Sequence, residues 1–141
     1  MILTKQSKVY VVQGDAALLE GLYDDEFLEN IGDTSHSPCW TCPQTAEEND
    51  LMLIYLMRPI SAIVGSARIA SEPFMNTDRN SRWFGKKMVV FEDLKMLNSD
   101  DFLPLWKMNE LFPHWQWTRR PQGAVRVPQE YKDNLLAFLR L

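Results

Sequence analysis

Five tryptophans are the residues whose chemistry stands out in this chain of 141 residues. Each lies in or beside a segment whose sequence pattern is irregular, where an indole ring is held at the edge of a fold. Rings in such places can stack on a planar base or enclose a methylated one, although packing beneath a loop is the commoner role of any single ring. The five are Trp40, Trp83, Trp106, Trp115 and Trp117.

Basic side chains accompany two of these tryptophans. One group surrounds Trp83, and the pair Arg119-Arg120 follows Trp117. A cation beside a stacking ring is what a phosphate contact next to a bound base requires, and an ordinary solvated surface has the same composition. The group around Trp83 consists of Arg79, Arg82, Lys86 and Lys87.

Cys39 and Cys42 form a single Cys-x-x-Cys pair next to Trp40. A structural zinc ion needs about four ligands, so both histidines of the chain, His36 and His114, would have to converge on the pair. A redox-active pair would stand at the start of a helix after a strand, whereas prolines bracket this one. We therefore expect reduced thiols, no metal ion and no cofactor.

The net charge of −4 argues against a general binder of polyanions, but it averages two unequal parts. Residues 1–50 hold ten acidic residues and two lysines, a net charge of −8, and residues 51–141 hold nine acidic and thirteen basic residues, a net charge of +4. A local positive face on an acidic molecule suits a nucleic acid gripped at one place.

The length is close to that of one ordinary domain, so we expect residues 1–141 to form a single domain and a monomer. The longest apolar run, residues 51–57, is far shorter than the roughly 20 residues of a membrane span. Residues 1–7 do not resemble a signal peptide. We expect a cytoplasmic protein without a membrane partner.

The first half of the chain must position Trp40. Its pattern predicts a strand over residues 8–13, ended by Gly14, and then a helix over residues 16–30 with Asp15 as N-cap. A polar loop over residues 31–49 follows, and a loop of that length in a small domain is usually functional or disordered.

Residues 50–71 are the most strand-like part of the chain. The continuous apolar run at 51–57 predicts a strand buried on both faces, and a turn at Arg58-Pro59 leads to a second strand. Gly65 in that strand suggests a bulge or bend, as where a small barrel turns a corner.

The second half is less regular. Its pattern predicts strands over residues 86–94 and 124–127, a capped turn over residues 98–105, and an irregular segment over residues 106–122. Pro128 opens a last helix with one apolar side. The whole order predicts an α+β fold, a curved sheet or pseudo-barrel of about five or six strands flanked by helices. That apolar side consists of Tyr131, Leu135, Phe138 and Leu139.

The sequence resembles the YTH and EVE branches of the PUA-like superfamily over roughly residues 8–94. In YTH domains a tryptophan followed by Ser or Thr precedes a strand of the "ILIF" kind, and the next strand runs "GFARLSSEP". Here Trp40-Thr41 precedes LMLIYLM, and GSARIASEP occupies residues 65–73. EVE domains carry a similar strand end and then a strand that leads into a short helix, which residues 89–94 resemble.

The resemblance implies a PUA-like fold and a reader of modified bases that has no catalytic activity of its own. YTH domains bind N6-methyladenine in RNA, and modified cytosines in DNA are among the ligands proposed for EVE domains. The implied partner is DNA or RNA carrying a modified base, with cleavage left to an effector nuclease in trans.

The resemblance also implies a site. Trp40 matches the first cage tryptophan, Trp83 is the candidate for the second, and Trp106 is a further candidate ring. Ser37 and Thr41 would hold the polar edge of the base. This interpretation requires the Trp40 indole to face an open cleft wide enough for a flat heterocycle.

Two other classes stay open. An ASCH-type hydrolase, which shares the barrel, would remove an acyl group from a modified cytidine and needs a lysine, a threonine or serine and a carboxylate in one pocket. A protein-interaction module would expose residues 106–117 as an apolar patch. The candidates for the hydrolase are Lys5, Lys8 or Lys107 with Thr41 and Glu72.

Overall fold

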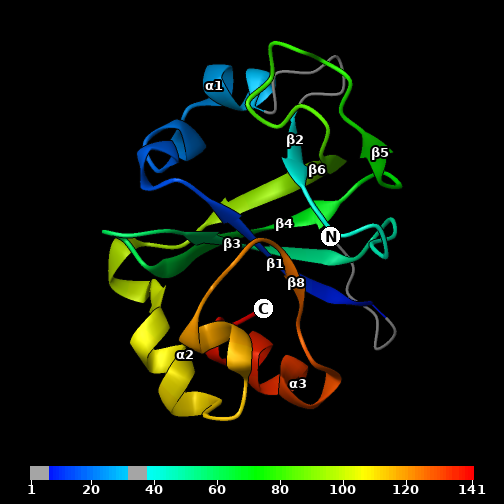
Figure 1. Cartoon of the computed structure of the whole chain (residues 1–141). Coiled ribbons are helices and arrows are strands. Elements are labelled where there is room, and N and C mark those ends of the chain that lie inside the picture. The colour runs from blue at the N-terminus through cyan, green and yellow to red at the C-terminus, as the bar shows by residue number, and fades with distance from the viewer. Residues whose placement is uncertain (1–6, 32–37) are drawn as a thin grey trace.

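The computed structural model describes residues 7–31 and 38–141 of the chain. One strongly curled sheet carries the fold, with strand order β2-β6-β4-β3-β1-β8 and with β5 and β7 pairing to β6 and β4 (Figure 1). The strands are β1 Val9–Gly14, β2 Cys39–Thr41, β3 Leu51–Leu56, β4 Ala62–Ile69, β5 Phe74–Met75, β6 Lys87–Met96, β7 Leu103–Pro104 and β8 Val125–Arg126.

The central strands are buried on both faces. β3 lies between β1, with which it runs parallel, and β4, with which it runs antiparallel, and all its residues are buried. Its side chains alternate between two hydrophobic clusters, so Met52, Ile54 and Leu56 enter one and Leu51, Leu53 and Tyr55 enter the other. This confirms the prediction from the continuous apolar run.

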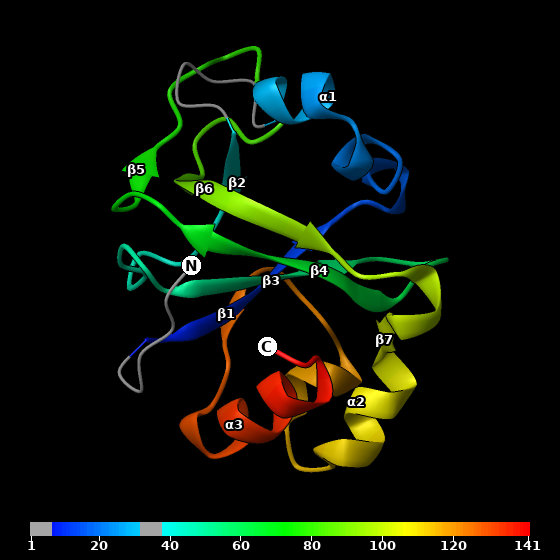
Figure 2. The same ribbon diagram turned by 180° about the vertical axis from the view of Figure 1, so that it is seen from behind.

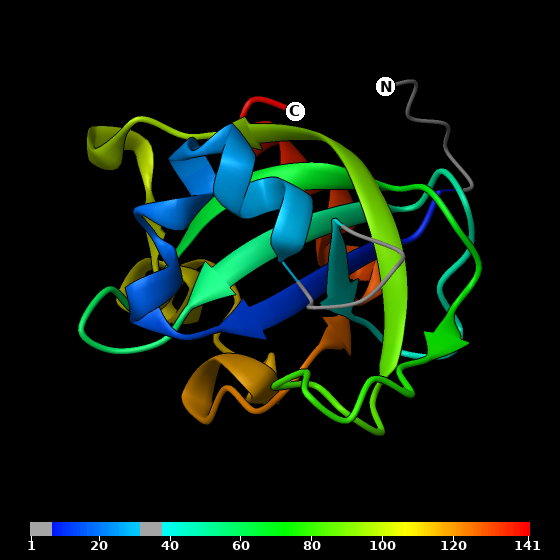
Figure 3. The ribbon, with the colours of Figure 1, turned by 90° about the horizontal axis from the view of Figure 1, so that it is seen from above.

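β6 bends the sheet into a half-barrel (Figure 3). Its first half pairs with β2 and β5, and its second half pairs with β4. A Cβ on Gly65 would lie 2.9 Å from the carbonyl oxygen of Lys95, so only glycine allows β6 to cross β4 this closely. The register of β4 against β3 also shifts beside Gly65, which confirms the predicted irregularity.

Helical segments cover the two faces of the sheet separately (Figures 1 and 2). One face carries two single-turn 3₁₀ segments, η1 Ala16–Leu18 and η2 Gly21–Tyr23, and α1 Asp25–Asn30. The opposite face carries α2 Leu105–Leu111 and α3 Gln129–Phe138, with η4 Gln116–Arg119 between them, and η3 Ser99–Asp101 precedes β7. The predicted α+β class and the curved sheet of about six strands are confirmed.

The continuous helix predicted over residues 16–30 is wrong. The helical conformation is interrupted at Asp24, whose backbone is extended, and the Phe27 ring of the next helix packs against Gly21, where a Cβ would lie 2.4 Å from the ring. Asp24 then starts a new helix by accepting a hydrogen bond from the Glu26 amide at 3.0 Å. Asp15 precedes η1, but its side chain makes no capping hydrogen bond.

Three further expectations need correction. The loop predicted over residues 31–49 contains β2, and the segment predicted as irregular over 106–122 contains most of α2 and all of η4. Phe138 is 45% exposed, whereas Leu135 and Leu139 are buried as predicted. These elements are held by tertiary contacts, since β2 is only three residues long and gains its place by pairing with β6.

Three other predicted elements are confirmed. β8 pairs with β1, β6 overlaps the strand predicted over residues 86–94, and α3 begins directly after Pro128, its N-cap residue. The turn predicted over residues 98–105 contains η3, but the Asn98 side chain makes no capping hydrogen bond. In the described parts of the chain, no helix combines the length and the apolar character that a membrane span requires.

Candidate nucleic-acid interface

The fold brings Trp40 and Trp83 together. Trp40 lies on β2 and Trp83 lies in the turn that leads into β6, and their ring centroids are 5.4 Å apart with an interplanar angle of 41°. Phe91 of β6 lies edge-on to Trp40 at 6.4 Å. The two rings that were predicted as cage walls therefore do lie in contact.

Trp40 forms the fixed wall of this pair. Its Nε1–H donates a hydrogen bond to the carbonyl oxygen of Gln13 at 3.2 Å. Its six-membered ring fits against Gly14, where a Cβ would lie 2.6 Å from Cζ2. The side chain is 0% exposed. The expectation of an open cleft in front of Trp40 is therefore wrong for this structure, because Trp83, Phe91 and the end of β1 cover the ring.

Trp83 is the accessible member of the pair. It is half-buried, and its position depends on Asn76, a residue buried at the start of the same loop. Asn76 Nδ2 donates to Ser81 Oγ at 2.9 Å, and this oxygen accepts from the Trp83 amide at 3.1 Å. Asn76 Oδ1 also accepts from the Asp78 amide at 2.9 Å.

Sequence reasoning missed Asn76. Asparagine often bonds to the backbone two residues further on, and the segment Asn76-Thr77-Asp78 shows this pattern. The signal was available in the sequence, but it marks a turn and gives no indication that the asparagine is buried.

A positive loop surrounds Trp83. Arg79, Arg82 and Lys86 are exposed, and Lys87 is half-buried at the start of β6. The Arg82 guanidinium lies 5.9 Å from the centre of the Trp83 ring, which is cation–π distance. The structure thus places a half-exposed ring among cations, as the sequence predicts.

The remaining base-binding candidates are placed differently. Thr41 follows Trp40 on β2, is half-buried, and pairs with Met88 of β6. Ser37 lies outside the described residues. Trp106 lies on α2, across the sheet from Trp40, and is 68% exposed. The structure does not bring Trp106 to the pair.

Residues 106–117 do not form one exposed patch, so that expectation is wrong. Trp115 and Trp117 are buried and stacked at 5.5 Å, and Trp117 meets Tyr55 edge-on at 5.3 Å. The large apolar residues that remain exposed in this segment are Trp106 and Leu111 of α2. Arg119 and Arg120 are exposed, but the Trp117 ring beside them has no free face for stacking.

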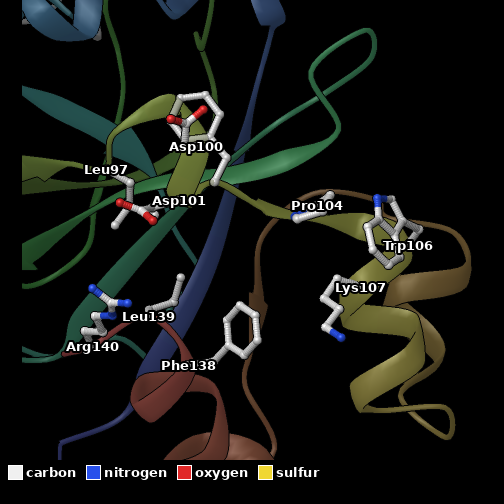
Figure 4. Close-up of a pocket in the computed structure, with 10 residues that line it drawn as sticks. Leu97, Asp100, Asp101, Pro104, Trp106, Lys107, Phe138, Leu139 and Arg140 are labelled. Carbon is white, nitrogen blue, oxygen red and sulfur yellow. The ribbon is translucent and has the colours of Figure 1, made fainter.

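Trp106 lines a cavity of about 550 Å³ between η3, α2 and the end of α3 (Figure 4). Figure 4 shows Asp101 and Arg140 toward one end and Trp106 and Lys107 toward the other, with Phe138 between them. The lining mixes exposed apolar rings with charges of both signs.

A different cavity, of about 580 Å³, contains part of the predicted hydrolase set: Lys8 and Glu72 line it, whereas Thr41 does not, and Thr45 is a further lining residue. Lys8 Nζ donates to the Thr45 carbonyl oxygen at 2.6 Å and to Glu47 Oε1 at 2.8 Å. The bond to Glu47 raises the pKa of Lys8. Lys107 lies on α2, paired with Glu110 at 3.8 Å, and Lys5 lies outside the described residues.

The two cysteines are buried and form no disulfide. Burial raises the pKa of Cys42 to about 12, so its thiol stays protonated at neutral pH and is a poor nucleophile. Within residues 7–31 and 38–141, no three His, Cys, Asp or Glu residues cluster as metal ligands. His36 lies outside these ranges.

The sequence matches no model of a known protein family, and no curated protein matches it. Solved structures do match. The ASCH protein of Zymomonas mobilis has 13% sequence identity and a TM-score of 0.62, covering 92% of this chain and 94% of that one. Human THYN1, solved with DNA containing 5-methylcytosine, has 14% identity and a TM-score of 0.63, covering 96% and 99%.

The YTH domain of the Zygosaccharomyces rouxii MRB1 protein, solved with N6-methyladenosine RNA, also matches, with 10% identity and a TM-score of 0.60 over 99% of this chain and 90% of that one. Likeness at these identities establishes the fold. The chain shares the fold of these three proteins, which confirms the fold predicted from its sequence.

Proposed function

We propose that this protein is a nucleic-acid-binding module that takes one unstacked, modified base of DNA or RNA at the Trp40–Trp83 pair. The observation that carries the proposal is the contact of these two rings, 5.4 Å apart, beside an exposed basic loop. The complexes of the two structural neighbours with 5-methylcytosine DNA and N6-methyladenosine RNA support the same class of ligand.

The base enters by displacing Trp83 while Trp40 stays in place. Trp40 is fixed by its bond to Gln13 and by Gly14, whereas Trp83 belongs to a surface loop. Separating the rings costs about 0.5–1.5 kcal/mol, and stacking a base on an aromatic ring returns roughly 1–3 kcal/mol. A base can therefore replace the contact between the rings.

The methyl group alone gives modest discrimination. Burying one methyl is worth about 0.8 kcal/mol, or roughly fourfold in affinity. Larger ratios require hydrogen bonds that fix the base in one orientation. Arg79, Arg82, Lys86 and Lys87 supply phosphate contacts that add affinity without reading the base.

The test is a binding panel of fluorescent single-stranded and duplex oligonucleotides that carry N6-methyladenine, 5-methylcytosine or no modification. Binding is measured by anisotropy at two salt concentrations. We expect preference for one modified single strand, and a loss of roughly 5- to 150-fold on Trp83→Ala, which removes one stacking ring.

Trp106→Ala is the matched control, because it removes an exposed indole far from the pair. Affinity unchanged by Trp83→Ala, in a protein whose circular dichroism and melting temperature match wild type, would rule out the proposed site. Equal binding of every oligonucleotide by wild type would rule out base reading.

A hydrolase is the second candidate, because Lys8, Thr45 and Glu72 line one cavity and an ASCH protein shares the fold. As the residues stand, Lys8 is a poor general base, since it is paired with Glu47 and its pKa is raised. Release of cytidine from an acylated cytidine by wild type, and its loss in Lys8→Ala, would replace the binding function by this one.

A further inference from the structure

Three arginines surround a cavity of about 460 Å³ near the carboxyl ends of β1 and β3. Arg58 comes from the turn between β3 and β4, and Arg119 and Arg120 come from the end of η4. None of the described residues that line the cavity is acidic. The full lining is Gln13, Tyr55, Met57, Arg58, Ser61, Leu105, Arg119, Arg120 and Pro121.

Among residues 7–31 and 38–141, no carboxylate pairs with these arginines. Arg68, by contrast, is paired with Glu92 and lies 3.4 Å from Asp93. Arg58, Arg119 and Arg120 form no ion pair with any residue in the described part of the chain. Three guanidinium groups without a carboxylate, in a protein of net charge −4, make a local site for an anion.

Arg119 is fixed in place, because its Nη2 donates to the carbonyl oxygen of Pro113 at 2.9 Å. Its remaining donors, and those of Arg58 and Arg120, are available for a second acceptor. A planar guanidinium group can donate two parallel hydrogen bonds to two phosphate oxygens, which no other side chain does as well.

Neutral donors complete the lining. Tyr55 is only 3% exposed, and burial raises its pKa, so its hydroxyl keeps its proton. The Trp117 ring supports Tyr55 edge-on at 5.3 Å. Gln13 is held in place by the Gly123 amide, which donates to its side-chain oxygen. Met57, Leu105 and Pro121 add apolar surface on which a sugar can lie.

We infer that this cavity binds an internal phosphate of the nucleic-acid strand together with its sugar. Its volume lies within the roughly 300–1,000 Å³ of small-ligand sites, so it takes a nucleotide unit rather than a bare ion. The inference rests on the proposed function, because the same strand delivers the base to Trp83. In the view from above, the loop over residues 76–86 and η4 lie toward the same edge of the molecule, the loop above the sheet of Figure 1 and η4 below it (Figures 1 and 3).

The test compares two variants with equal loss of charge. R58Q/R119Q/R120Q removes the three cavity cations, and K95Q/R126Q/R140Q removes three exposed cations elsewhere. We expect the cavity variant to bind a ten-nucleotide strand about tenfold more weakly than the control variant, and its salt slope to fall by about 0.7 for each lost phosphate. The ratio of modified to unmodified affinity stays at the wild-type value.

The strand is supplied with a 5′-hydroxyl or a 5′-phosphate. If the 5′-phosphate increases the affinity of wild type and this increase disappears in the cavity variant, the cavity binds a terminal phosphate. That result would overturn the inference for an internal phosphate. Equal affinity of the two triple variants would overturn it altogether. A wild type that binds all bases alike, with the cavity variant still weakened, would remove the proposed function and leave the phosphate site standing.

Discussion

At the scale of single residues, burial decides what Trp40 and the cysteines can do. The indole of Trp40 is fixed by one hydrogen bond to Gln13 and by the missing side chain of Gly14. Cys39 and Cys42, on either side of it, are buried with their thiols reduced. Cys42 packs in the hydrophobic cluster that contains Trp40.

The first prediction concerns the reactivity of Cys42. Its pKa is raised by burial from 9.0 to about 12, so its thiolate fraction near pH 8 is ~1,000-fold lower than that of an unfolded thiol. In the Cys39→Ala variant, we expect Cys42 to react with iodoacetamide more slowly in native protein than in urea by at least that factor. Mass spectrometry follows the alkylation.

The same shift sets a pH dependence of stability. The raised pKa favours the folded state fully below pH 9, and this contribution is lost as the pH rises from 9 toward about 12. Urea unfolding between pH 8 and 11 should show a decline that is smaller in Cys42→Ala. Alkylation within tenfold of the unfolded rate would contradict the burial of this thiol.

At the scale of elements, the loop before β6 is built around one polar side chain. The Asn76 side chain bonds to the Ser81 hydroxyl and to the Asp78 amide. The backbone amide of Asn76 donates to the carbonyl oxygen of Lys86, and the amide of Gly85 donates to the carbonyl oxygen of Asn76. Gly85 has φ +80°, a conformation that favours glycine. The loop therefore presents Trp83 from a defined turn.

We predict that Asn76→Ala loosens this loop without unfolding the sheet. Loss of a buried hydrogen-bonding group costs about 1–3 kcal/mol, and the amides of residues 77–86 should exchange faster with solvent. Base discrimination should fall with it, because Trp83 loses its position.

Asn80→Ala is the control for Asn76, since Asn80 is exposed in the same loop. It should change the free energy of unfolding by less than about 0.5 kcal/mol. Equal hydrogen exchange in both variants would show that Asn76 does not organise the loop.

At the scale of the molecule, one sheet serves two separate hydrophobic clusters. The cluster that contains Trp40 lies beneath η1, η2 and α1, and the cluster that contains Trp117 lies beneath α2 and α3. Substitutions in the proposed base site and substitutions of buried residues on the opposite face therefore affect different parts of the core.

This division predicts opposite results for two tryptophans of the C-terminal part. Trp117→Ala should cost about 3–5 kcal/mol of unfolding free energy, since Trp117 packs on Tyr55 and Trp115. Trp106→Ala should change it by less than about 0.5 kcal/mol, because that ring is exposed. Urea denaturation measures both. Similar costs would mean that Trp106 is packed in solution.

The elements that the sequence predicted well are strands marked by an apolar run. The run at 51–57 and the strands at 8–13 and 86–94 correspond to β3, β1 and β6, because continuous or alternating apolar residues determine a strand locally. The continuous helix predicted at 16–30 is broken at Asp24, whose backbone is extended and whose side chain caps the next helix. The apolar spacing of the segment continues through this break and does not show it.

The pairing of two tryptophans was predictable from the sequence, but their burial was not. Trp40 and Trp83 were identified by their surroundings and by the family resemblance, and the structure brings them together. That Trp40 is covered, and that Trp106 faces away, depends on how β2 pairs with β6 and how α2 lies on the sheet. Such placement follows from tertiary packing, which spacing along the chain does not contain.

Gln13 joins the two faces of the sheet. Its carbonyl oxygen accepts the Trp40 Nε1–H on one face, while its side chain holds Gly123 beside the arginine cavity on the other. A ligand that shifts this residue from either side changes the free energy of binding on both. By reciprocal linkage, a ligand in the proposed phosphate cavity and a base at the proposed indole site would then alter each other's affinity by the same factor.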